Sequence, residues 1–220
     1  MGIASNVIIL SRTKMSGDKI CVGGYCLAQK KYVRLLSNTA QALHVDEPYQ
    51  IGEIYEIQYS PRYSYQIDAP HVEDIAVYEK KYLQTLNSND LINKVVTPLC
   101  IGPLHIKNLF ESTLKWKNDK GYILKSAIPS SSVVIVRLSH ILEKKQSEDS
   151  FSYTDRNLFL SRKYAVKYVG EEVLNEDVIL QPGTPIRFSL ARWWDGNGNF
   201  LDDQGSSEKR SYLQLSGFYL

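Results

Sequence analysis

The chain has 220 residues, 43% of them hydrophobic and 23% charged, and its formal net charge is +2. This composition allows a packed core and excludes global disorder, and the chain lacks the run of about 18 apolar residues that a membrane-spanning helix requires. A net charge this small does not by itself indicate a nucleic-acid-binding protein.

The charges are nevertheless segregated along the chain. Residues 1–45 carry six basic side chains against one acidic side chain, residues 46–79 carry one against eight, and residues 107–125 carry five against two. Segregation of this kind can give a nearly neutral protein a basic face. The alternative is that folding mixes the two signs again on an ordinary solvated surface.

The cysteines and the first residues bear on location and cofactors. Cys21, Cys26 and Cys100 have no zinc-site spacing, so we expect structural thiols in a reducing compartment and no metal. The apolar start of the chain lacks the basic segment and the cleavage site of a signal peptide. We therefore expect a cytoplasmic protein that needs no cofactor and contacts no membrane.

The first part of the chain predicts about five strands and no helix. Apolar or alternating runs that are typical of strands occur at residues 6–10, 20–27, 32–35, 51–59 and 74–83. Turn residues at 14–19 and a break at 28–31 separate the first three. Gly23 and Gly24 fall inside a strand and indicate a bulge or a bend. Five short strands with such a bend are typical of a small closed barrel, for instance an OB-fold.

The middle of the chain changes character. Ser88 is a candidate N-cap before a helical turn at residues 90–96, which Pro98 ends. Four apolar residues at i, i+3, i+4 and i+8 predict a second helix over residues 106–116: Ile106, Leu109, Phe110 and Leu114. Residues 87–128 therefore read as a helical connector.

The last ninety residues are β again. Strand patterns occur at residues 131–142, 162–170, 183–194 and 211–220, with polar turns at 143–150 and 195–199. The predicted fold is mainly β, with two small OB-like β-barrels joined by a short helical connector. The predicted boundaries are 1–86 for the first barrel, 87–128 for the connector and 129–220 for the second barrel.

The stretch Pro70-His71-Val72-Glu73-Asp74 raises the question of catalysis. An imidazole beside two carboxylates can act as a general base or a metal site. In a strand, however, His71 and Glu73 share one face and Asp74 points to the other. Carboxylates at the start of a strand also commonly bind backbone N–H groups. Structural support, contact with a ligand and metal-dependent catalysis therefore all stay open here.

The common phosphate-binding, hydrolase and zinc-protease motifs are absent from the sequence, so we expect no enzymatic activity. Basic and aromatic residues in or beside the strands are better candidates, because OB-type barrels bind single strands through aromatic stacking and a cationic groove. The candidate nucleic-acid-binding residues are Arg12, Lys14, Tyr32, Arg34, Tyr63 and Arg192. The structural alternative places Tyr32 in the core, pairs Arg34 with Glu73 or Asp74, and uses the aromatic residues beside Arg192 for packing.

These segments resemble the dual OB-containing domain family of bacterial proteins. The family pattern has a Thr before a Cys-Val-x-Gly strand, a strand that ends in Arg-Leu, a Gly-x-x-Tyr strand and a Pro-His-x-Glu-Asp signature. The matching residues are Thr13, Cys21, Val22, Gly24, Arg34, Leu35, Gly52, Tyr55, Pro70, His71, Glu73 and Asp74. The resemblance implies paired barrels, nucleic-acid binding and an association with bacterial conflict or antiphage systems. It also implies that His71, Glu73 and Asp74 form a family motif at the rim of the first barrel, and it carries over no catalytic residue.

Two functions follow from these observations. The first is a non-enzymatic module that binds DNA or RNA, with single strands favoured over other structures, as an accessory or sensor subunit of a bacterial antiphage system. The alternative is an adaptor that docks onto a nuclease, helicase or other effector protein, or that associates with itself. Salt-dependent binding by the isolated chain would distinguish them, because contacts with phosphates release counterions.

Overall fold

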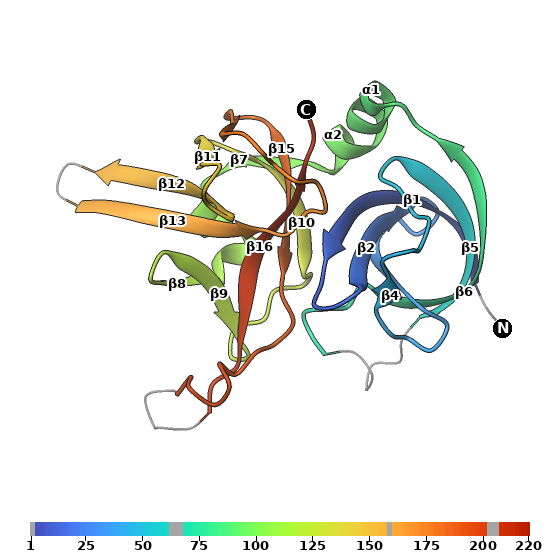
Figure 1. Ribbon diagram of the computed structural model, residues 1–220, viewed down its shortest axis with the longest axis horizontal. Coiled ribbons are helices and arrows are strands. Elements are labelled where there is room, and N and C mark those ends of the chain that lie inside the picture. Colours follow the sequence, from blue (N-terminus) through green and yellow to red (C-terminus); the bar gives the residue numbers. More distant parts are fainter. Residues whose placement is uncertain (1–2, 62–67, 158–159, 202–206) are drawn as a thin grey trace. The chain divides into compact units, whose positions relative to one another are not determined.

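The computed structural model of the protein describes four stretches of the chain: residues 3–61, 68–157, 160–201 and 207–220. The chain divides into two compact units (Figure 1). The first unit contains Met1–Pro98 and Val169–Glu172, and the second contains Leu99–Tyr168 and Val173–Leu220. The protein is mainly β, with two OB-like barrels and a helical connector, as the strand patterns of the sequence predict.

The first unit is built on one sheet. Its strands are β1 Ile3–Lys14, β2 Lys19–Cys26, β3 Lys31–Leu36, β4 Leu43–His44, β5 Glu53–Pro61 and β6 Asp74–Thr85. Five of them close into a barrel, because β1 pairs with both β2 and β5, and the order around the barrel is β1-β2-β3-β6-β5. Only β3 and β6 run parallel. This is the Greek-key connectivity of the OB-fold, and Figure 1 shows these strands curving around a common centre.

The interior of the first barrel takes the apolar side of the alternating strands. Its buried cluster is Val7, Ile9, Ile20, Val22, Cys26, Val33, Leu35, Leu43, Tyr49, Tyr55, Ile57, Tyr59, Ile75 and Val77. Gly24 permits a close crossing of β1 and β2, since a Cβ there would lie 2.6 Å from Cγ1 of Val7 and 2.8 Å from the carbonyl oxygen of Ile8. The irregularity expected at the glycines lies on the partner strand, where the register shifts between Ile9 and Ser11.

The segment after β6 is helical. It consists of α1 Ser88–Asp90, the π-helical η2 Leu91–Val96 and α2 Thr97–Leu99. The N-cap is Asn87, one residue before the predicted Ser88, and its side-chain oxygen accepts a hydrogen bond from the backbone N–H of Asp90 at 2.9 Å. No helix in the described stretches has both the length and the apolar character needed to cross a bilayer.

The second predicted helix, over residues 106–116, is wrong. The chain instead forms two 3-10 turns, η3 Ile106–Asn108 and η4 Phe110–Ser112. Leu109 between them is extended, with φ −62° and ψ 156°, and all three residues of η4 have positive φ. The apolar residues that gave the helical spacing are buried in the second unit all the same. An irregular segment can therefore place side chains into a core at helix-like intervals.

The second unit is also built on one sheet. Its strands are β7 Ile101–Leu104, β8 Lys115–Lys117, β9 Lys120–Leu124, β10 Val133–Leu138, β11 Leu142–Lys144, β12 Ser150–Asn157, β13 Leu160–Tyr168, β14 Val178–Leu180, β15 Pro185–Leu190 and β16 Arg210–Phe218. The strands β10, β15, β16, β13 and β12 are neighbours in that order, and β11 pairs with β12. As β3 and β6 do in the first unit, β13 and β16 run parallel. With β10 and β11 as a divided first strand, the connectivity repeats that of the first barrel.

Three further features distinguish the second unit from the first. β9 pairs with both β13 and β16, and β8 forms a hairpin with β9. Figure 1 shows β12 and β13 as a long hairpin that extends beyond its neighbours. The core contains Phe151, Val166, Leu180, Phe188 and Leu215, all fully buried.

Candidate nucleic-acid interface

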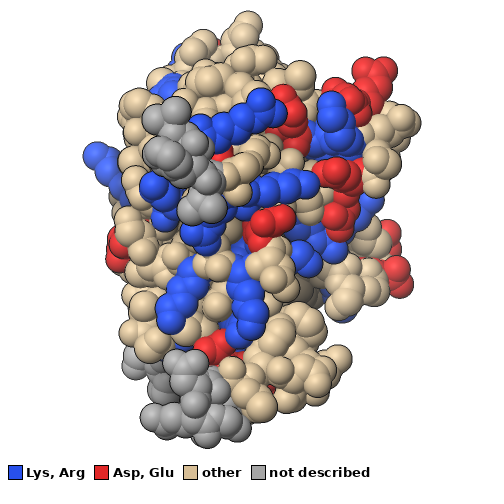
Figure 2. Space-filling model, turned by 90° about the vertical axis from the view of Figure 1, so that its left-hand side faces the viewer, with Lys and Arg blue, Asp and Glu red and all other residues tan. Residues whose placement is uncertain are grey.

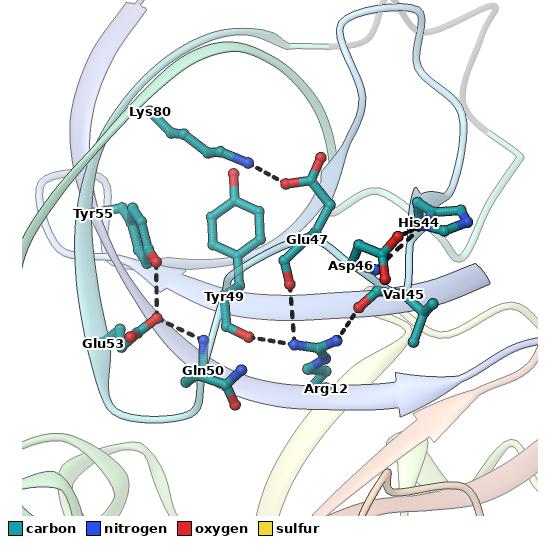
Figure 3. A network of polar contacts seen from close by, with 10 residues as sticks. All are labelled: Arg12, His44, Val45, Asp46, Glu47, Tyr49, Gln50, Glu53, Tyr55 and Lys80. Carbon is teal, nitrogen blue, oxygen red and sulfur yellow. Dashed lines mark hydrogen bonds and ion pairs between the residues drawn. The ribbon is translucent and has the colours of Figure 1, made fainter. Parts of the chain in front are cut away.

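Arg12, one of the predicted contact residues, holds a loop of the first unit in place. Only 8% of the residue is exposed, and its Nη1 donates to the carbonyl oxygens of Glu47 and Tyr49 at 3.1 and 3.0 Å. Nη2 donates to the carbonyl of Val45, and Nε lies 2.6 Å from a carboxylate oxygen of Glu171. Figure 3 shows the guanidinium facing the loop between β4 and β5. These contacts give Arg12 a structural role, and its contact with nucleic acid stays a prediction.

The same loop is closed by further polar contacts. Lys80 pairs with the Glu47 carboxylate, and its Nζ lies 4.7 Å from the centroid of the Tyr49 ring (Figure 3). The Tyr55 hydroxyl donates to Glu53 at 2.9 Å. Burial and this bond raise the pKa of Tyr55 to about 12, and burial also raises the pKa of Tyr49, so both phenols stay neutral at physiological pH.

Arg34 meets the Pro-His-x-Glu-Asp motif where β3 and β6 pair. Its Nη2 donates to Oδ2 of Asp74 at 2.5 Å, and its backbone N–H donates to the Glu73 carbonyl at 2.7 Å. Both side chains of the ion pair are largely covered, at 16% and 10% exposure. Burial alone would lower the pKa of Arg34, but interactions with Cys21, Asp74 and Glu73 outweigh it and raise that pKa. The predicted structural alternative, an Arg34–Asp74 pair, is confirmed.

The rest of the motif is buried in the first unit. His71, Glu73 and Asp74 are all below one tenth exposed. Within the described stretches, no group of three or more His, Cys, Asp or Glu side chains is placed to hold a metal ion. The pairing of Asp74 with Arg34 joins the start of β6 to β3, which is a structural task. Contact of this motif with a ligand stays a prediction.

The other predicted contact residues are scattered. Lys14 ends β1 with an exposed side chain, and Tyr32 is half-buried on β3 with its ring centroid 5.6 Å from that of Tyr25. Tyr63 lies outside the described residues. Arg192 is exposed and belongs to the second unit, in the segment that follows β15. Their part in nucleic-acid binding stays a prediction.

A basic surface lies on the outward side of β9, β13 and β16 in the second unit. Alternation in these strands turns Ile123, Val166 and Leu213 into the core. The outward positions are Lys120, Tyr122 and Leu124 on β9, Lys163, Ala165 and Lys167 on β13, and Arg210, Tyr212 and Gln214 on β16. Figure 2 shows Lys and Arg side chains outnumbering Asp and Glu on a face of this unit. We call the outward side of β9, β13 and β16, together with the two cavities described next, the basic face.

The larger cavity of the basic face, about 710 Å³, has a cationic lining. Among the described residues, its charged lining consists of Lys115, Lys117, Lys125, Lys209, Arg210 and Glu208. Arg210 donates through Nε to Glu208 at 2.6 Å, and its guanidinium lies 4.6 Å from the Tyr122 ring centroid and 4.3 Å from that of Phe200. Glu208 is thus engaged by Arg210, and the four lysines are exposed.

The smaller cavity, about 420 Å³, adjoins the larger one. Tyr122 lines the larger cavity and Tyr212 the smaller one, and their ring centroids are 5.8 Å apart. Three cations and one carboxylate face the smaller cavity: Lys120, Lys167, Arg192 and Asp149. Trp194 also lines it and is 49% exposed. The basic face thus combines positive charge with one accessible aromatic ring, that of Trp194, which is the chemistry of a single-strand binding groove.

Sequence reasoning identified only Arg192 on this face. A signal was present in the five lysines of residues 107–125, since Lys115, Lys117, Lys120 and Lys125 all line one of the two cavities. The expectation of a helix in part of this segment hid the β8–β9 hairpin that presents them. Strand pairing then adds lysines from distant parts of the chain.

Two solved structures are similar over nearly the whole chain. The crystal structure of the tetrameric p202 HIN2 is 11% identical with a TM-score of 0.30 and covers 98% of this chain and 95% of that one. A murine DNA-binding protein bound with double-stranded DNA is 8% identical with a TM-score of 0.28 and covers 98% of both chains. TM-scores this low carry no argument about function.

A search of curated proteins found no match. The family profile described as the dual OB-containing domain, however, matches residues 5–218, which is nearly all of the chain. Two sheets with OB-like connectivity agree with that description. The chain therefore belongs to the dual OB-containing domain family.

Proposed function

We propose that this protein is a non-enzymatic module that binds nucleic acid, with single strands favoured, through the basic face of its second unit. The observation that carries the proposal is the lining of the larger cavity, where the described residues include four exposed lysines and Arg210 but one carboxylate, that of Glu208. A polyanion supplies negative charge to a lining in which cations predominate. A phosphodiester chain supplies it at regular intervals.

Lysine suits contact with a backbone rather than with a particular base. Its ammonium is a compact charge on a flexible stem and donates to phosphate oxygens without a demand on sequence. The exposed ring of Trp194, which lines the smaller cavity with Lys120 and Lys167, favours single strands, because an unpaired base can stack on it at about 1–3 kcal/mol. Paired bases are already stacked on their neighbours and gain less.

Fluorescence anisotropy with labelled single-stranded DNA, single-stranded RNA and duplex DNA tests the proposal across a salt series. If the four lysines each contact one phosphate, the logarithm of the association constant falls with the logarithm of salt concentration at a slope of about −3 for single strands. Single strands are expected to bind more tightly than the duplex at every salt concentration.

Salt-independent binding, or no binding at micromolar protein, would contradict the proposal. The adaptor alternative would then be favoured, and co-purification with an effector protein or self-association in sedimentation would be the next observation. An accessory or sensor role in a bacterial antiphage system remains an expectation from the family, and it is compatible with either outcome.

A further inference from the structure

We infer that the smaller cavity of the basic face holds one unpaired nucleotide of a bound strand, with its base on Trp194 and its phosphate among the surrounding cations. The inference rests on the proposed function and names what binds at one place on that face. It also gives a physical reason for a preference for single strands.

Trp194 is an exposed ring on a held backbone. Its N–H and carbonyl exchange hydrogen bonds with Arg210 at 2.9 and 2.8 Å, which ties the segment after β15 to the start of β16. Its ring packs edge-on against Phe200 at 5.1 Å between centroids and contacts Tyr212 at 6.2 Å. These contacts leave 49% of the residue exposed. A ring held in this way loses little conformational entropy when a base stacks on it.

The charges around Trp194 fit one nucleotide. Among the described residues, Lys120, Lys167 and Arg192 line the cavity together with one carboxylate, that of Asp149. Asp149 accepts from the Ser150 hydroxyl at 3.0 Å and lies 3.5 Å from Lys167, and both members of that ion pair are more than 60% exposed. An exposed pair of this kind is weak, so Lys167 can turn to a phosphate at small cost.

The size and the remaining lining also fit. The volume of about 420 Å³ lies in the range of about 300–1,000 Å³ that small ligands occupy. Gln214 faces the cavity, and its amide can both donate to and accept from the edge of a base. A base inside a duplex can reach Trp194 only by leaving its stack, which costs a few kcal/mol. The cavity therefore favours strands that are already unpaired.

The larger cavity lacks this feature. Its ring, Tyr122, is covered by the guanidinium of Arg210, which also lies over Phe200. A base has no open aromatic surface there, so that cavity is suited to phosphates alone. The smaller cavity thus binds a base and its phosphate, and the larger cavity binds phosphates. A variant in one cavity serves as the control for a variant in the other.

The test compares an oligo-adenine strand with a strand of the same length in which every base is removed. The two have the same phosphate charges and differ only in bases. We expect the base-bearing strand to bind about tenfold more tightly to the wild-type chain. Trp194→Leu should remove this difference and leave the affinity for the abasic strand unchanged, and Trp194→Phe should keep part of it. Lys117→Ala should weaken both strands by the same factor.

Thermal unfolding of each variant checks that it is folded. Arg192→Gln removes one of the cations that line the cavity and also lies at an exposed position. Equal affinity for the two strands, or an equal loss with the abasic strand in Trp194→Leu, would overturn the inference while the proposed function stands. Absence of salt-dependent binding by every strand would overturn both. Adenosine monophosphate tests whether the cavity binds a free nucleotide rather than a nucleotide of a strand. If it binds at micromolar concentration while the two strands bind equally, the cavity is a free-nucleotide site and the inference is overturned.

Discussion

The two units share a strand connectivity and use their cations in opposite ways. In the first unit Arg12 and Arg34 direct their guanidinium groups to main-chain carbonyls and to the carboxylates of Glu171 and Asp74. In the second unit the outward cations are mostly lysines around two cavities, and the described lining of each cavity includes one carboxylate. The planar fork of arginine suits several fixed acceptors, whereas lysine keeps its ammonium in water. The identity of a cation and its neighbours, more than its strand, decides whether it is available to a ligand.

The largest effect on stability is expected at Arg12. Arg12→Ala removes the donors of three carbonyls and leaves Glu171 unpaired, and it should lower the free energy of unfolding by about 3 kcal/mol. Arg12→Lys keeps the charge without the fork and should cost less. Urea denaturation measures both. A loss below about 1 kcal/mol for Arg12→Ala, together with weaker nucleic-acid binding, would return Arg12 to the role of a contact residue.

The Arg34–Asp74 pair comes next. A double-mutant cycle with Arg34→Ala and Asp74→Ala should give a coupling free energy of about 2 kcal/mol, because both side chains are mostly covered. The same denaturation curves supply the values. Additive single variants would contradict the pair. A fall in nucleic-acid affinity in Arg34→Ala without a loss of stability would show that Arg34 faces a ligand.

Acid should act on the second unit through His140. Its Nε2 accepts from the backbone N–H of Ile106 at 3.1 Å, and its Nδ1 lies 3.1 Å from the carbonyl of Ile141, which requires a neutral ring. Burial lowers the pKa of His140, and burial also lowers that of its neighbour His105. The folded state therefore binds these protons less readily than the unfolded state, whose histidines titrate near 6.5.

The neutral histidines therefore make their full contribution to the free energy of unfolding above a pH of about 6.5. This contribution is lost as the pH falls below that value, by at most about 1.4 kcal/mol per pH unit for each histidine. Thermal unfolding at pH 7.5 and 5.5 measures the loss. His140→Gln cannot titrate and should show a smaller decrease in melting temperature over this interval. An unchanged pH dependence in that variant would exclude His140 as its source.

The smallest effect is expected at Tyr32. Its ring already contacts Tyr25 within the first unit, so Tyr32→Ala should change the affinity for single-stranded DNA by less than about twofold, far below the effect of one stacked base. Anisotropy titrations at low salt measure this change. A tenfold loss of affinity with stability intact would show that the outward side of β2 and β3 contacts nucleic acid.

The alternating segments made the fold predictable. A strand with one side on the core repeats apolar residues every second position, and β5 was identified in this way. The sequence of β6 also alternates, although its first four residues are buried and the other eight are exposed. β12 was missed because only Phe151 and Tyr153 among its eight residues are apolar. The helix over residues 106–116 was a wrong prediction because four buried side chains happened to follow helical spacing in a segment of turns.

The candidate site was predictable only in part. The Arg34–Asp74 pair was available as an alternative because two opposite charges occur in adjoining strands of the predicted barrel. Arg12 donates to backbone carbonyl groups, which every residue has, so the sequence does not indicate these partners. The basic face joins β9 to β13 and β16, and such pairing between distant segments cannot be read from the local sequence.

The most direct test of the account is a comparison of two charge reversals. Lys115→Glu with Lys117→Glu acts on the basic face, and Lys30→Glu with Lys31→Glu makes the same charge change at exposed lysines of the first unit. The affinity for single-stranded DNA at low salt should fall about a hundredfold in the first double variant, with a salt slope shallower by about 1.4, and less than threefold in the second. Equal losses in both, or a larger loss in the second, would contradict the assignment of binding to the second unit.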